Sequence, residues 1–336
     1  MDRRAFLSAA GACSLISASA PQLAQAQPAR RFAQAMRYSA ERNGASFLVV
    51  RHGIVMGESY PRGDADTRWP IGAGARPFAA LLAATLVEDR LMTLDEPVAL
   101  TLGDWGAHPV KASISIRMLV NGTSGIAFGR NDRRDLFDAI SLEPVETPGA
   151  RFIDDPAPYR LLVEIARRKL MTAGREPDPA RYLTDRVLAP IGCVPIGWAR
   201  WPDGAPRFDE GVVVSGRGWA QAGELLRREG VWRAQQLADD NTLREAVRGS
   251  FAESRAGFGV WIAAPGRTRE DPGINTDLWR DSSPAPMDLC MAAGDGGQRL
   301  YFSPSEGVVI VRQSNTIDPR ADWSDAQFLS LVWPDL

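Results

Sequence analysis

The feature that most constrains this chain is an apolar run from Phe78 to Val87, in which Thr85 is the single polar residue. The run is too long for one strand and predicts a buried helix. Pro77 suits the first turn of that helix, where its missing N–H costs nothing. The helix follows a glycine-rich turn, a place where enzymes often carry a nucleophile. Residues 72–76 are nevertheless Gly, Ala, Gly, Ala and Arg, so the turn offers no nucleophilic atom.

Strand patterns lie near both ends of the chain, and helical patterns lie between them. Residues 46–60 predict a hairpin that turns at His52-Gly53, and residues 288–315 predict two long strands around a turn at 304–307. Apolar spacings of three and four residues predict a short helix from Ser115 and further helices at about 132–141, 157–170, 178–191, 216–229 and 241–249, with a closing helix capped by Ser324. Residues 263–286 are rich in Pro, Gly and charge and predict a loop.

This order of elements predicts an α+β fold for one domain at residues 27–336. An antiparallel sheet, flanked by the first and last helices, comes from about residues 32–70 and 255–336. An all-helical lobe at about 71–254 is inserted between them, and a cleft is expected where two such lobes meet.

The first 26 residues have the pattern of a secretory signal peptide. Arg3 and Arg4 precede a weakly apolar stretch, and Ala24-Gln25-Ala26 fits a cleavage site. The DRRAFL start favours a twin-arginine signal, although an ordinary signal peptide with two arginines remains the alternative. We therefore expect a periplasmic or secreted protein. No other stretch approaches the length of a membrane span.

The composition excludes several classes of function. A net charge of −2 does not favour nucleic acid or an anionic membrane as a partner. The two histidines, His52 and His108, and the scattered aspartates lack the spacing of a metal site, so neither a metal nor a cofactor is expected. Cys193 and Cys290 could pair in an exported protein, but two buried thiols are the preferred interpretation.

Four segments, in this order, resemble the serine β-lactamase and penicillin-binding-protein superfamily, in particular its class-C-like serine hydrolases and esterases. They are IGAGARPFAALLAATLVEDRLMTLDEPVA, SISIRMLVNGTSGI, PGARF with the following YRLLVEIARR, and AAGDGGQRLYFSPSEGVVIVRQSN. The resemblance extends from about residue 40 to residue 333. It implies a sheet domain with a helical lobe and a cleft where a serine forms an acyl-enzyme.

The resemblance also implies which chemistry belongs at each motif. The serine of an S-x-x-K motif attacks a carbonyl, and the lysine and a tyrosine of a second motif share the proton transfer. A third motif on an edge strand helps to hold the oxyanion. In this chain Ala73 stands in the serine position, Arg76 in the lysine position and Asp154 in the tyrosine position. Asp295, followed by Gly296 and Gly297, stands at the third motif.

A shifted alignment does not restore the catalytic motif. The chain has two lysines, Lys111 and Lys169, and the residues three positions before them are His108 and Ala166, so S-x-x-K occurs nowhere. Arginine cannot replace lysine as a base, because its pKa stays above about 12. Losing a nucleophile typically costs about 10⁶-fold in kcat. The sequence therefore predicts a site that no longer carries out acyl transfer.

Three hypotheses follow from the sequence. The first is an inactive member of this fold whose old cleft binds a small polar or peptide-like ligand. The residues expected to line that cleft are Arg76, Asp154, Asp155, Asp295, Gly296, Gly297 and Gln298. The second is a working esterase or amidase with relocated catalytic residues, and the third is a structural or partner-binding subunit. The opposite charges also predict an ion pair between Arg76 and Asp154 or Asp155 across the old site.

Overall fold

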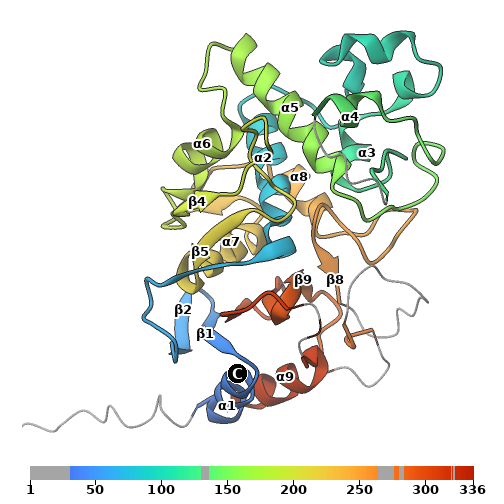
Figure 1. Cartoon of the computed structure of the whole chain (residues 1–336). Helices are drawn as coiled ribbons and strands as arrows, with labels where there is room; N and C mark the ends of the chain where they lie inside the picture. Colours follow the sequence, from blue (N-terminus) through green and yellow to red (C-terminus); the bar gives the residue numbers. More distant parts are fainter. Residues whose placement is uncertain (1–30, 130–135, 264–275, 280–283, 319, 321) are drawn as a thin grey trace, which may run out of the picture.

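A central antiparallel sheet organises the protein, for which the computed structural model describes residues 31–129, 136–263, 276–279, 284–318, 320 and 322–336. Within those residues the strand order is β2-β1-β11-β10-β9-β8 (Figure 1). The strands are β1 (Gly44–Arg51), β2 (Ile54–Ser59), β8 (Trp261–Ile262), β9 (Cys290–Gly294), β10 (Gln298–Ser303) and β11 (Val308–Ser314). Phe47 of β1 lies opposite Arg312 of β11, and Val49 lies opposite Ile310. The prediction that the two ends of the chain share one sheet is confirmed.

Alternate residues of β1 pack in two separate hydrophobic cores, because successive side chains of a strand point to opposite faces. Phe47 and Val49 pack in one apolar cluster with Phe328, and the rings of Phe47 and Phe328 meet edge to face at 5.9 Å. Leu48 and Val50 belong to the cluster on the opposite face. The first cluster lies under α1 (Ala33–Glu41) and α9 (Asp325–Val332), which contact each other beside the sheet at the bottom of Figure 1.

The other face of the sheet is covered by α7 (Gly216–Arg227), which contacts β1, β10 and β11. The approach is close: a Cβ on Gly223 would stand 2.7 Å from Cδ1 of Leu300 and 3.0 Å from Cγ1 of Val309. Only glycine fits there without moving the helix away from the sheet. Because α7 packs on the sheet, the expected helical lobe at 71–254 is wrong for this helix. Its apolar spacing predicted a helix but not the layer against which that helix packs.

The apolar run forms α2 (Pro77–Glu88), and every residue from Pro77 to Leu86 is buried. The one polar side chain in the run is satisfied, since the hydroxyl of Thr85 donates to the carbonyl of Leu81 at 2.6 Å. Helices pack around α2 in the upper part of Figure 1. They are α3 (Ile116–Val120), α5 (Ala157–Thr172), α6 (Pro179–Leu183) and α8 (Asp240–Ala246), while α4 (Leu136–Ser141) packs on α5. The prediction of a buried helix from Pro77 is therefore confirmed.

Short elements complete the described part of the chain. One small sheet consists of β3 (Arg68–Pro70), β4 (Gly197–Trp198) and β5 (Val212–Ser215). A second consists of β6 (Val231–Trp232) and β7 (Gln235–Gln236). Short helical turns are η1 (Gly72–Ala75), η2 (Val98–Leu100), η3 (Gly103–Ala107), η4 (Lys111–Ser113), η5 (Thr184–Leu188), η6 (Asp295–Gly297) and η7 (Trp333–Asp335). Ser324 accepts a backbone N–H bond at the start of α9, as predicted, and Ser115 does the same at the start of α3.

Two predicted elements differ from the structure. The helix expected at 178–191 is α6 followed by the π-helical turn η5, so it is wider at its end than the regular spacing suggested. The structure has three strands where the sequence predicted two at 288–315, because η6 divides the first predicted strand into β9 and β10. Gly296 and Gly297 adopt φ values of 74° and 73° there, which glycine tolerates without strain.

Other predictions fall partly outside the described residues. The helix expected at 132–141 is described from Leu136 onward, and residues 130–135 lie outside the description. Most of the loop expected at 263–286 and the signal peptide expected at 1–26 also lie outside it. Within the described ranges, no helix is long and apolar enough to cross the hydrocarbon core of a membrane.

Both described cysteines are free and buried, in agreement with the preferred interpretation. Burial raises the pKa of both thiols, and that of Cys193 reaches about 12. Neither thiol is therefore a reactive thiolate near neutral pH.

Candidate functional site

The glycine-rich turn η1 carries the chain into α2 against the end of β9. A Cβ on Gly74 would stand 2.8 Å from the ring of Trp219, and one on Gly294 would stand 2.2 Å from the carbonyl oxygen of Ile71. Glycine at these two points lets the turn sit between α7 and β9. Ala73, half-buried in the turn, occupies the position where the resemblance places a nucleophilic serine. The scaffold that would present a nucleophile is therefore present without one.

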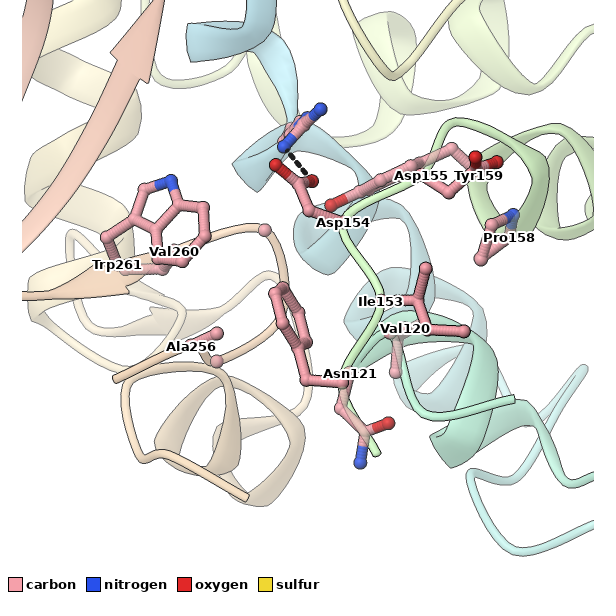
Figure 2. Close-up of a pocket in the computed structure, with 15 residues that line it drawn as sticks. Val120, Asn121, Ile153, Asp154, Asp155, Pro158, Tyr159, Ala256, Val260 and Trp261 are labelled. Atoms are coloured by element: carbon pink, nitrogen blue, oxygen red, sulfur yellow. Dashed lines mark hydrogen bonds and ion pairs between the residues drawn. The ribbon is translucent and has the colours of Figure 1, made fainter. Parts of the chain in front are cut away.

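Arg76 and Asp154 form an ion pair across this site, in which Nη1 of Arg76 donates to Oδ1 of Asp154 (Figure 2). Their side chains are 17% and 21% exposed. The prediction that Arg76 pairs with one of the two neighbouring aspartates is confirmed for Asp154. Only one hydrogen bond joins the two groups, and Nε of Arg76 is buried without a hydrogen-bond partner among the described residues. The pair is therefore mostly buried, and one of its donors is unsatisfied.

The surrounding charges keep this arginine protonated. Burial works to lower the pKa of Arg76, but the neighbouring Tyr159, Asp154 and Asp209 raise it above its ordinary value. The guanidinium carbon lies 5.6 Å from the centre of the Tyr159 ring, within range of a cation–π contact. Burial raises the pKa of Tyr159 to about 12, so its phenol stays neutral at ordinary pH. The site therefore contains a permanent cation beside a neutral phenol.

The second aspartate has a different role. Asp155 is buried, and its carboxylate accepts backbone N–H bonds from Phe128 at 2.9 Å, Gly129 at 3.0 Å and Ala157 at 2.8 Å. These bonds tie the start of α5 to the loop at 126–129. Asp155 is among the residues around the cavity, as expected, but its carboxylate is committed to the backbone rather than to Arg76 or a ligand.

The four expected cleft residues at 295–298 do not line the cavity. Asp295 is exposed beside the η1 turn, and Gly296 is so tightly held that a Cβ would stand 2.0 Å from the carbonyl oxygen of Thr316. Gln298 is fully buried, and its amide donates to the carbonyl of Ser314 at 2.9 Å and accepts the Ser314 N–H at 2.9 Å. Gly297 packs against Arg312 and Trp323, neither of which lines the cavity. The amide of Gln298 is therefore committed to β11. The place of Asp295, Gly296 and Gly297 in a ligand cleft stays a prediction.

The cavity beside the ion pair is small. The space open to the centre of a water-sized sphere is about 20 Å³, room for roughly one water molecule. Figure 2 shows Asp154 and Tyr159 on one side of it and Trp261 on the other. Its full lining is Arg76, Val120, Asn121, Gly122, Phe152, Ile153, Asp154, Asp155, Pro158, Tyr159, Ala256, Gly257, Gly259, Val260 and Trp261. The space beside Arg76 and Asp154 therefore holds no more than about one water molecule.

Sequence reasoning missed three residues that shape this site. Tyr159 follows Asp154 closely in the sequence, and its place in the first turn of α5 was a signal that could have been used. Trp261 stands on β8 and forms the opposite wall, with its ring edge to face with Phe152 at 5.8 Å. Asp209 is buried and adds negative charge near Arg76. No pattern in the sequence linked Trp261 or Asp209 to the motifs.

Nothing in the described residues resembles a metal centre. Among them, no three His, Cys, Asp or Glu side chains gather closely enough to hold a metal ion. Charge in the old site is instead balanced within the protein, by Arg76 and the acidic side chains around it.

Comparison with solved structures finds the same fold at low identity. A family VIII carboxylesterase is 15% identical with a TM-score of 0.69, and the match covers 93% of this chain and 98% of the other. A penicillin-binding protein homologue from Caulobacter crescentus is 18% identical with a TM-score of 0.65, covering 91% and 98%. A class C beta-lactamase is 13% identical with a TM-score of 0.63, covering 90% and 93%. At these identities the likeness shows the fold alone.

Comparison with known sequences gives two results. No curated protein matches this chain. The model of the Beta-lactamase family matches residues 29–331, nearly the whole chain beyond the expected signal peptide. The fold is accordingly the α+β arrangement of β-lactamases and transpeptidases, an antiparallel sheet with helices, as the resemblance implied. The chain belongs to the Beta-lactamase family of serine hydrolases.

Proposed function

We propose that this chain is an exported member of the Beta-lactamase family that does not carry out acyl transfer. The observation that carries the proposal is the ion pair between Arg76 and Asp154, next to Ala73 in the nucleophile position. An acyl-enzyme needs a nucleophile and a group that takes its proton. Ala73 supplies no nucleophile. Arg76 holds its proton, because the acidic groups around it raise its pKa further.

The ion pair also bears on ligand binding in the old cleft. The cavity beside the ion pair is about 20 Å³, far below the several hundred Å³ (~300 or more) of typical small-molecule pockets. A polar or peptide-like ligand would have to separate Arg76 from Asp154 before it could enter. The geometry therefore supports a closed site rather than a ligand-binding cleft.

A relocated catalytic centre has less support. The ring of His108 is committed: Nε2 lies 2.9 Å from the Glu143 carboxylate, and Nδ1 accepts the N–H groups of Val110 and Lys111. Ser124 is buried and accepts the N–H of Ile126 at 3.3 Å. Among the described residues, no hydrogen bond joins a serine hydroxyl to either histidine.

A covalent probe tests the loss of acyl transfer directly. The purified chain is incubated with a fluorophosphonate probe, and separately with chromogenic esters and a chromogenic β-lactam. We expect no labelling beyond that of the heat-denatured chain and no turnover. Labelling that disappears in Ser124→Ala would identify a relocated nucleophile and would contradict the proposal, as would any turnover that survives purification.

Restoring the missing groups tests whether chemistry alone was lost. The variant with Ala73→Ser, Arg76→Lys and Asp154→Tyr regains the three groups that the family uses, and we expect it to react with the probe. Ala73→Ser alone should react little, because Arg76 keeps its own proton and cannot take that of the serine. Equal labelling of the single and triple variants would show that the Arg76–Asp154 pair is not what prevents the reaction.

Export rests on residues 1–26 and is tested separately. We expect the full chain to be recovered in the periplasmic fraction, cleaved near Gln27. Changing Arg3 and Arg4 together to lysine should leave it uncleaved in the cytoplasm, because the twin-arginine route reads that pair. Normal export of this variant would favour an ordinary signal peptide.

A further inference from the structure

A second, much larger groove lies on the helical lobe and shares no residue with the cavity of the old site. It runs between the end of α2, the η2 turn and the last turns of α5, and the space open to the centre of a water-sized sphere is about 580 Å³. Its lining is Arg90, Leu91, Leu100, Thr101, Arg167, Arg168, Lys169, Met171, Thr172 and Ala173. We call these residues the basic groove. None of these residues is one of the motif positions Ala73, Arg76, Asp154 and Asp295.

The basic groove contains four cationic side chains and no acidic one, although the whole chain carries a net charge of −2. The carboxylates that hold three of these cations lie beneath the surface. Glu164, which is 2% exposed, accepts bonds from Arg167 at 2.7 and 2.8 Å and from Arg168 at 2.6 Å. Lys169 pairs with Glu96 at 2.5 Å. Two carboxylates below four cations leave the groove with a net positive charge.

The fourth cation, Arg90, is not held in this way. It is the first residue after the C-cap of α2, in the left-handed region with a φ of 59°, and it is exposed. Among the described residues no carboxylate pairs with Arg90. Its charge is therefore available to a partner at the mouth of the groove, without first breaking an internal ion pair.

Apolar side chains stand among these charges. Leu100 is 71% exposed and Met171 is 55% exposed, and both line the groove. Leu100 and Met171 therefore place exposed apolar surface beside the four cations of the groove. Methionine in particular adapts its shape to a partner's apolar side chain. The groove thus offers positive charge and apolar contact together.

We propose that the basic groove docks an acidic segment of a partner protein, one that carries several Asp or Glu residues and at least one bulky apolar side chain. The carboxylates would contact Arg90 and the outward faces of Arg167 and Arg168, and the apolar side chain would cover Leu100 and Met171. A small inorganic anion would leave the apolar residues uncovered, and a neutral peptide would leave the cations unmatched. Because Glu164 and Glu96 already position three of the four cations, ordering them costs little on binding.

A synthetic peptide tests this docking on the intact chain. The probe is a fluorescein-labelled peptide that alternates Glu and Leu, and binding is followed by fluorescence anisotropy. Matched peptides replace Glu with Gln or Leu with Ser. We expect saturable binding of the Glu-Leu peptide that weakens as salt rises, since exposed charges are screened, and at least about tenfold weaker binding of each matched peptide, about 1.4 kcal/mol.

Variants of the chain locate the binding site. Arg90→Glu and Leu100→Asp change exposed residues, so both should fold normally. Each should weaken the peptide at least about tenfold. The control is Arg233→Glu, because Arg233 is also exposed, also has a positive φ of 46°, and lies outside the groove. It should leave the affinity unchanged.

Three results would overturn the proposal. The first is an absence of saturable binding to the intact chain. The second is an equal effect of Arg233→Glu and Arg90→Glu, which would indicate attraction by overall charge. The third is displacement of the peptide by inorganic polyphosphate together with no effect of Leu100→Asp, which would identify the groove as an anion site that does not recognise a protein segment.

Discussion

Removing the carboxylate of Asp154 should destabilise the fold, because it leaves the Arg76 guanidinium mostly buried and without a counter-charge. The two side chains are 17% and 21% exposed, so about four-fifths of each is out of water. Breaking a fully buried pair costs about 3–5 kcal/mol, whereas an exposed pair contributes under about 1 kcal/mol. Nε of Arg76 already lacks a hydrogen-bond partner among the described residues. We therefore expect Asp154→Ala to cost about 2–4 kcal/mol.

The assay is urea unfolding followed by tryptophan fluorescence, with Trp261 in the wall of the site as one reporter. A loss of stability shifts the midpoint while the slope stays constant. In a double-mutant cycle, Arg76→Ala and Asp154→Ala should couple by about 1–3 kcal/mol, as expected for groups in direct contact. Replacing both by apolar residues, Arg76→Met with Asp154→Leu, should recover stability to within about 1 kcal/mol of the native chain.

The matched control is Asp295→Ala, which removes an exposed aspartate from the third motif position. It should change stability by less than about 0.5 kcal/mol. Equal midpoint shifts for Asp154→Ala and Asp295→Ala, or strict additivity in the cycle, would refute the argument that the ion pair holds the old site closed.

Three further predictions concern the core, the acid response and the thiols. Leu82→Ala should cost about 2–5 kcal/mol in urea unfolding, because Leu82 is fully buried in α2; a loss well under 1 kcal/mol would contradict a core role. Hydrogen bonds from Arg217 lower the pKa of Glu58, so this pair stabilises the fold above the ordinary pKa of the carboxyl and loses that contribution as pH falls through the lowered value. Glu58→Gln should therefore flatten the decline of stability below about pH 4.5, and an unchanged acid profile would count against the linkage. Cys193 and Cys290 should react with a thiol reagent at pH 8 only after unfolding, in a chain that lacks residues 1–26, since burial raises both pKa values. Rapid labelling of the native chain would show that at least one of them is accessible.

Local patterns predicted much of the fold. The apolar run specified a buried α2, and the turn at His52-Gly53 specified the hairpin of β1 and β2, because both signals lie within a few neighbouring residues. The absence of S-x-x-K was also a property of the sequence alone, since a missing side chain is missing in every conformation. Family membership followed from four motif segments in the right order.

Local patterns could not predict which way each strand residue faces or against which layer each helix packs. Gln298 was expected to face a ligand, but β10 directs its side chain to Ser314, since one step along a strand moves a side chain to the opposite face. α7 was recognisable as a helix by its apolar spacing, which says that one face is buried but not against what. In both cases the deciding contact lies far away in the sequence.

What the sequence by itself determined about the site is its residue types: Ala73 and Arg76 lack the hydroxyl and the amine of a Ser-Lys pair, and Asp154 lacks a phenol, wherever the chain places them. What only the tertiary structure decided is how their charges are used. Arg76 and Asp154 are 78 positions apart and meet because α2 and the segment before α5 pack together, whereas Asp155, one residue further, turns to backbone N–H groups of a different loop. Residue types are local information, but the choice between two adjacent carboxylates depends on which group each reaches, and only the packed chain specifies that.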